Sequence, residues 1–137
     1  MPTETLTTEL YWLTLTVLMT GLMWLPYIIN RMTEQGIAFA IWDPQGETKT
    51  AVLWADRMAR AHKNAVENLV IFAPLVLTLQ LSQSNNELTA LACMVYFFAR
   101  LIHYFVFSFG IPMLRVITFM VSVAAQLILA FTVLGIL

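Results

Sequence analysis

Charge is scarce in this chain of 137 residues: seven basic and eight acidic side chains make up 11% of it, against 60% hydrophobic residues. Soluble domains carry about 25% charged residues, so the composition disfavours a water-soluble globule. A single cysteine, Cys93, excludes an internal disulfide framework. Five glycines exclude a collagen-like repeat, and a net charge of −1 provides no general attraction to nucleic acid.

Several chemical motifs are also missing. The chain has two histidines and no cluster of carboxylates or thiols near them, so we expect no metal site. It contains no Gly-rich phosphate-binding loop and no G-x-S-x-G nucleophile motif. These absences disfavour metalloenzymes, nucleotide-binding proteins and serine hydrolases.

Long hydrophobic runs are abundant. Leu10–Asn30 and Val116–Leu137 contain no charged residue, and each is longer than the roughly 18–20 apolar residues that span a bilayer. Asn68–Asn86 is a third run, and Leu88–Leu114 is a fourth, interrupted only by Arg100. We therefore expect an all-α, multi-pass integral membrane protein with a single domain over residues 1–137. Its four helices would lie at roughly residues 8–30, 56–81, 86–108 and 112–136.

The connections between the runs are short, except for the polar stretch over residues 31–52. Short connections predict an antiparallel four-helix bundle. Ser84 and Glu87 have the spacing of a capping box, which predicts Ser84 as the N-cap of the third helix. Gly110 suits the end of that helix and Pro112 the start of the fourth.

All seven basic residues lie toward the first and third connections: Arg31, Lys49, Arg57, Arg60, Lys63, Arg100 and Arg115. The N-terminal segment and the second connection contain none. Because basic residues favour the cytoplasmic side, we expect both termini outside the cytoplasm.

Polar residues also occur inside the expected helices. A sector of about 80° on the second helix carries four of them, namely Arg57, Arg60, Asn64 and Glu67. The third helix has a similar stripe of Arg100, His103 and Phe107. A cation in hydrocarbon costs at least about 2.5–3.5 kcal/mol, so Arg100 must face a partner or a wet cavity. We expect Glu67 to be its protein partner.

Guanidinium groups, an amide and one carboxylate on facing helices suit a small, mostly anionic zwitterion. Arginine binds carboxylates, and a glutamate can hold an ammonium group. Glutathione fits this description, and an arginine near its thiol would favour the thiolate. Apolar surface beside the site would suit a lipophilic second substrate. A purely structural network between helices is the alternative interpretation of the same residues.

Residues 60–67, with the sequence RAHKNAVE, resemble the R-A-x-x-N-x-x-E signature in the second helix of the MAPEG family. These are membrane-associated proteins of eicosanoid and glutathione metabolism. Phe98–Leu101 followed by His103 resembles the third helix of that family. Residues 67–69 and 110–115 look closest to a bacterial branch, which implies a bacterial inner membrane. Length, helix number and an outward N-terminus extend the resemblance over nearly the whole chain.

The resemblance implies a homotrimer with glutathione as co-substrate, bound between adjacent subunits and toward the cytoplasm. The implied glutathione-binding residues are Arg31, Arg60, Asn64, Glu67, Arg100 and His103. Arg115 matches an arginine that stabilises the thiolate in several members, and is the implied catalytic residue. The chain departs from the family at Phe107, where enzymes often have tyrosine, and at Asn68, where leukotriene-C synthase has tyrosine.

The leading expectation is a trimeric membrane glutathione transferase or glutathione-dependent peroxidase that acts on lipophilic electrophiles. One alternative is a non-catalytic protein of the same fold that binds lipids or a partner, because the family includes such a member. Another is a small four-helix multidrug transporter. That class needs a carboxylate within its first helix, whereas Leu10–Asn30 is uncharged.

Overall fold

The computed structural model describes residues 5–43, 46 and 49–137. The elements in this part of the chain are α1 (Thr8–Leu22), α2 (Leu25–Gln35), α3 (Ile37–Ile41), α4 (Leu53–Leu81), α5 (Glu87–Ser108) and α6 (Pro112–Val133). Four segments are long and apolar enough to cross a membrane: Thr8–Gln35, Leu53–Leu81, Glu87–Ser108 and Pro112–Val133. The expected all-α membrane protein with four spans is confirmed.

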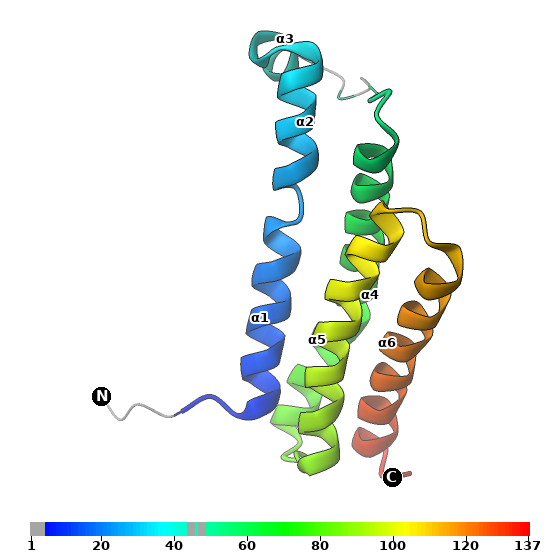
Figure 1. Ribbon diagram of the computed structural model, residues 1–137. Helices are drawn as coiled ribbons and strands as arrows, with labels where there is room; N and C mark the ends of the chain where they lie inside the picture. Colours follow the sequence, from blue (N-terminus) through cyan, green and yellow to red (C-terminus); the bar gives the residue numbers. More distant parts are fainter. Residues whose placement is uncertain (1–4, 44–45, 47–48) are drawn as a thin grey trace.

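The spans pack side by side as an up-and-down bundle (Figure 1). The start of α1 and the end of α6 lie at one end of the bundle, while α2, α3 and the turn between α5 and α6 lie toward the other. The connections that carry the basic residues therefore share one end of the bundle, and α1 begins and α6 ends at the opposite end.

The first span differs from the continuous helix expected over residues 8–30. It is divided between α1 and α2, and it extends to Gln35. Pro26 explains the division, because proline has no N–H to donate to the carbonyl of Leu22. The carbonyl of Met23, at the break, instead accepts a hydrogen bond from Tyr104 Oη at 2.7 Å. At the other boundaries, α4 begins at Leu53 rather than near 56, and α6 ends at Val133 rather than near 136.

The prediction that Ser84 caps the third span is wrong. Asn86 is the N-cap of α5: its side chain accepts from the Thr89 amide at 2.9 Å, and Thr89 Oγ1 accepts from the Asn86 amide at 2.9 Å. Thr89 Oγ1 also lies 2.6 Å from a carboxylate oxygen of Glu9, which is 3% exposed. A buried carboxylate needs a donor, so the contact with α1 helps to set where α5 begins.

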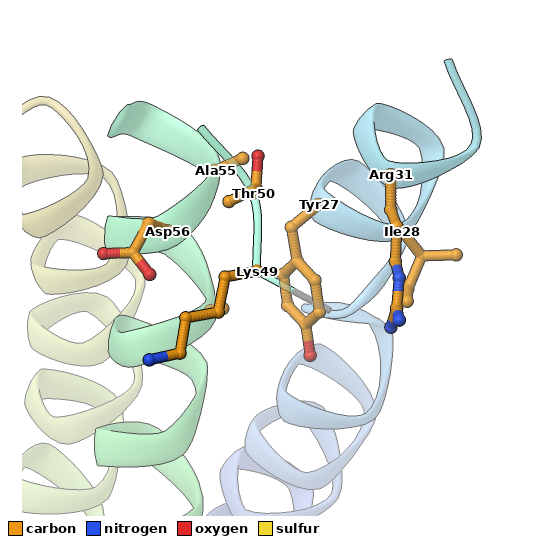
Figure 2. A pocket seen from close by; sticks show the side chains of 8 residues that line it. Tyr27, Ile28, Arg31, Lys49, Thr50, Ala55 and Asp56 are labelled. Atoms are coloured by element: carbon orange, nitrogen blue, oxygen red, sulfur yellow. The ribbon is translucent and has the colours of Figure 1, made fainter. Parts of the chain in front are cut away.

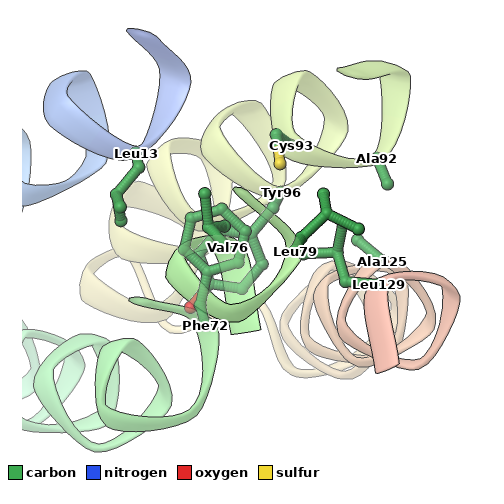
Figure 3. Packing of buried hydrophobic residues seen from close by; sticks show 9 residues of the cluster. All are labelled: Leu13, Phe72, Val76, Leu79, Ala92, Cys93, Tyr96, Ala125 and Leu129. Atoms are coloured by element: carbon green, nitrogen blue, oxygen red, sulfur yellow. The ribbon is translucent and has the colours of Figure 1, made fainter. Parts of the chain in front are cut away.

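Two apolar clusters form the core. The cluster nearer the termini contains Leu13, Phe72, Val76, Leu79, Ala92, Cys93, Tyr96, Ala125 and Leu129 (Figure 3). Within it, the rings of Phe72 and Tyr96 stack with their centroids 3.7 Å apart. The second cluster contains Met23, Met58, Ala61, Ala65 and Tyr104. Along α4 and α5, buried polar residues occupy the level between these clusters, and the candidate site is built there.

Candidate functional site

Arg100 is the most unusual buried residue of the bundle, with 2% of its surface exposed. Its Nη2 donates to Asn64 Oδ1 on α4 at 2.6 Å, and its Nη1 donates to Ser122 Oγ on α6 at 3.5 Å. The guanidinium group therefore ties three helices together. Both partners are neutral, so these bonds solvate the charge without neutralising it.

The expectation that Glu67 pairs with Arg100 is wrong. Within residues 5–43, 46 and 49–137, the ion pairs join Arg31 to Asp43 and Arg60 to Asp56. Glu67 lies on the exposed surface of α4. Asn64 and Glu67 are three residues apart, which places them about 60° apart around the helix. The rotation of α4 that turns Asn64 toward Arg100 therefore turns Glu67 outward.

The polar layer continues between α4 and α6. Asn68 Nδ2 donates to the Asn64 carbonyl at 2.9 Å, and Gln126 Nε2 donates to the Asn68 carbonyl at 3.2 Å. The sequence reasoning missed the contribution of α6, although a signal was present. Thr118, Ser122 and Gln126 recur every four residues in a helix that is otherwise almost wholly apolar, so they share one face.

His103 lies one turn along α5 from Arg100 and is also 2% exposed. Its Nδ1 lies 3.1 Å from the carbonyl oxygen of Arg115 and 3.0 Å from Thr118 Oγ1, both on α6. The imidazole is flanked by the rings of Phe107 and Phe119, with centroids 5.7 and 6.2 Å away. The opposite ring nitrogen, Nε2, is buried and has no hydrogen-bond partner among the described residues.

A hollow of about 190 Å³ opens beside this network. It is lined by Asn64, His103, Phe107, Arg115, Val116 and Phe119. The exposed Arg115 side chain reaches over Phe107, with its guanidinium carbon 5.0 Å from the ring centroid. The structure thus brings together four residues singled out from the sequence: Asn64, Arg100, His103 and Arg115.

The other three expected site residues lie elsewhere in the single chain. The Arg60 side chain is 70% exposed, and its Nε donates to Asp56 Oδ2 at 3.0 Å within α4. Glu67 is exposed on the same helix. Arg31 belongs to α2, where its guanidinium binds the Asp43 carboxylate and its Nε donates to Gln35 at 3.5 Å.

Arg31 lines a second hollow, of about 210 Å³, between α2 and α4. Its lining consists of Tyr27, Ile28, Arg31, Lys49, Thr50, Ala55, Asp56 and Ala59. In Figure 2, Tyr27 and Arg31 project from α2, while Ala55 and Asp56 belong to α4. Tyr27, which lines the hollow, also forms a hydrogen bond of 2.7 Å between its Oη and His62 Nδ1, and this bond links the same two helices.

An apolar groove runs along α5 and α6. Its wider part, about 280 Å³, is lined by Met94, Val95, Phe98, Ala99, Ile102, Thr118 and Val121. A further part of about 180 Å³ continues it toward Leu88 and Ile128, sharing Val95 and Val121. Thr118 lines this groove and also contacts His103, so one side chain separates the apolar groove from the polar layer.

Comparison with known sequences agrees with this architecture. The sequence profile of the MAPEG family matches residues 9–135, which is nearly the whole chain. No curated protein matches the chain.

Proposed function

The chain belongs to the MAPEG family, which is linked to glutathione and eicosanoid metabolism, and from this premise we propose that it is a membrane-bound glutathione transferase. The proposed reaction is attack of the glutathione thiolate on a lipophilic electrophile. Reduction of lipophilic peroxides by the same thiolate would be a peroxidase activity of the same site.

One observation carries the proposal: the hollow between α4, α5 and α6 has Arg115 on its wall and Arg100 directly behind Asn64. Among the lining residues that the structure describes, there is no carboxylate. Two cations without a matching anion favour an anionic ligand, because arginine pairs strongly with carboxylates and thiolates. Glutathione supplies two carboxylates and, once deprotonated, a thiolate.

The proposed roles follow from position. Arg115 is exposed at the hollow, where its charge can stabilise a thiolate without first breaking an ion pair. Asn64 and Arg100 hold the peptide from the buried side, and His103 contacts it at the thiol. The sulfur electron pair then forms the new bond to the electrophilic carbon, and the leaving group departs with its own electron pair.

Arg60, Glu67 and Arg31 enter the proposal through a homotrimer. Arg60 and Glu67 are exposed on a helix that crosses the membrane, and lipid is a poor environment for both charges. A neighbouring subunit that covers this face of α4 would shield both charges from lipid. The site then lies between subunits, with Glu67 binding the ammonium group and Arg60 and Arg31 binding carboxylates.

The bundle also has a proposed orientation in the membrane. The basic end of the bundle faces the cytoplasm, and both termini lie on the other side of a bacterial inner membrane. The glutathione site then opens toward the cytoplasm. The lipophilic substrate would approach through the bilayer.

A non-catalytic, lipid-binding function is the second candidate, and the apolar groove along α5 and α6 favours it. Six of the seven side chains that line the wider part are hydrophobic, the exception being Thr118. Such a groove suits an acyl chain whether or not a reaction follows.

Ultraviolet difference spectroscopy of the purified protein with glutathione at neutral pH separates the two candidates. A thiolate band in the wild type that is absent in Arg115→Ala supports the transferase. Absence of glutathione binding contradicts it and favours the lipid-binding function.

A further inference from the structure

The hydrogen bonds of His103 determine which of its ring nitrogens carries the proton. Nδ1 lies 3.1 Å from the carbonyl oxygen of Arg115, and a carbonyl oxygen can only accept. Thr118 Oγ1, the other neighbour of Nδ1, lies 2.8 Å from the Leu114 carbonyl, to which it donates. Nδ1 must therefore be the protonated nitrogen. In the neutral imidazole, Nε2 then carries the lone pair.

No donor in the described part of the chain bonds to that lone pair. Nε2 is buried and unpartnered within the described part of the chain, although buried polar groups are paired in the great majority of cases. A carboxylate or a thiolate cannot fill the position, because neither has a hydrogen to donate. The missing partner must be an X–H group such as a thiol, a hydroxyl or water.

Arg100 contributes a complementary unpartnered atom. Its Nε is also buried without a hydrogen-bond partner among the described residues, and an arginine N–H can only donate. Arg100 and His103 are three residues apart on α5, so their side chains lie on neighbouring turns of one face. A group that accepts from Arg100 and donates to His103 satisfies both atoms. A thiol has both properties, since its sulfur can accept a hydrogen bond and its hydrogen can be donated.

The lining of the hollow points to the same residue by elimination. Of the six lining side chains described, four are uncharged and lack a basic atom: Asn64, Phe107, Val116 and Phe119. The guanidinium group of Arg115 has N–H donors and no acceptor atom that could take up a proton. His103 is the remaining side chain of this set, and it can take up a proton.

We propose that His103 is a catalytic residue of the site and accepts the thiol proton of bound glutathione at Nε2. The inference rests on the proposed function and assigns the step that prepares its nucleophile. The S–H bond breaks and an Nε2–H bond forms, leaving a thiolate beside the imidazolium, where Arg115 stabilises it from the wall of the hollow and Arg100 from the buried side. The sulfur pair then bonds to the electrophilic carbon, and the departing group takes the proton from Nε2. Phe107 and Phe119 flank the imidazole, so the proposal requires their rings to turn aside for the thiol to reach Nε2.

The decisive variant is His103→Asn. The asparagine amide can replace the Nδ1–H donor toward Arg115, but it places no atom at the position of Nε2. The probes are glutathione and S-methylglutathione, which has no thiol hydrogen. We expect the variant to bind S-methylglutathione as the wild type does, to lose the thiolate band, and to lose at least about 100-fold in kcat.

A thiolate band and kcat that persist in His103→Asn would overturn the inference and leave the proposed function intact. A loss of affinity for S-methylglutathione as large as the loss for glutathione would also overturn the inference, because it would indicate that His103 has only a packing role. Absence of glutathione binding by the wild type would remove the proposed function itself, and the inference with it. These three results are therefore distinguishable.

Thr118→Val provides a second test that keeps His103 in place. It removes one of the two groups that hold Nδ1–H, so we expect kcat to fall about threefold to tenfold. Thr132→Val is the matched control, because Thr132 on the same helix also donates to the carbonyl four residues earlier at 2.8 Å. Equal kcat values for the two variants would contradict the role of Thr118 in positioning His103.

Discussion

Arg100 on α5 donates to Asn64 Oδ1 on α4 at 2.6 Å, which joins a buried cation to a neutral amide in the interior of the bundle. Moving a charge from water into the protein interior costs several kcal/mol. A hydrogen bond to an amide offsets part of that cost without cancelling the charge. The pair is therefore a stable structural element and also leaves a positive potential beside the hollow. The same bond holds Asn64 in place as part of the hollow's wall.

Changing Asn64 tests this arrangement in two directions. Asn64→Asp replaces the amide oxygen by a carboxylate, so we expect a higher Tm in detergent and at least about tenfold weaker glutathione binding, because the internal anion competes with the ligand. Asn64→Ala should also weaken binding, but it should lower stability by about 1–3 kcal/mol because Arg100 loses its best acceptor. Thermal denaturation and titration calorimetry provide both quantities. An equal fall of Tm in both variants would contradict the conclusion that the charge of Arg100 is uncompensated in the wild type.

Arg115→Ala should lower kcat at least about tenfold, since one oriented cation at a developing anion typically contributes that much or more. Glutathione affinity should change less, because the guanidinium is exposed and acts mainly on the sulfur. Arg115→Lys, which keeps the charge, should retain an intermediate kcat. Unchanged turnover in Arg115→Ala would refute the role assigned to this residue.

Glu67→Gln should weaken glutathione binding about threefold to tenfold, because an amide replaces the carboxylate proposed to hold the ammonium group. Turnover at saturating glutathione should stay the same. Glu87→Gln is the control, because Glu87 is an exposed carboxylate in the first turn of α5, at the opposite end of the bundle. The same Kd for both variants and the wild type would remove Glu67 from the site.

Tyr104→Phe should destabilise the bundle by about 1–3 kcal/mol, because the Met23 carbonyl at the break between α1 and α2 loses its donor. Tyr104 is 5% exposed, so water cannot easily replace the hydroxyl. Tyr11→Phe is the control, since Tyr11 is 51% exposed. Chemical denaturation in mild detergent measures the difference, and equal stabilities would contradict a structural role for this bond.

Gly110→Ala should cost about 1–2 kcal/mol, because Gly110 has φ +73°, a left-handed conformation that alanine adopts poorly. An added Cβ would also lie 2.8 Å from Nη1 of Arg57, but the end of an arginine side chain can move aside. Gly135→Ala isolates the backbone effect, since Gly135 has the same φ in open space. A Gly110→Ala cost that disappears when Arg57 is also changed to alanine would show that the contact, not the backbone, is responsible.

The length of the hydrophobic runs was sufficient to predict four membrane spans, because every apolar helix must match the same bilayer thickness. The boundaries were less predictable. Pro26 was a visible signal for the break after Leu22, whereas the cap of α5 depended on a competition between nearby polar residues. Asn86 is the N-cap, and it forms the capping box together with Thr89. Thr89 also contacts Glu9 on α1, which is distant in the sequence.

The sequence by itself determined the spans and the stripes of polar residues on each helix, since the helical period places residues around one axis. Only the tertiary structure decided which polar side chains meet. Arg100 pairs with Asn64 rather than Glu67, and His103 meets a backbone carbonyl of α6. The physical reason is that the rotation of one helix against its neighbours is set by packing of apolar side chains over the whole interface. No local pattern encodes that rotation.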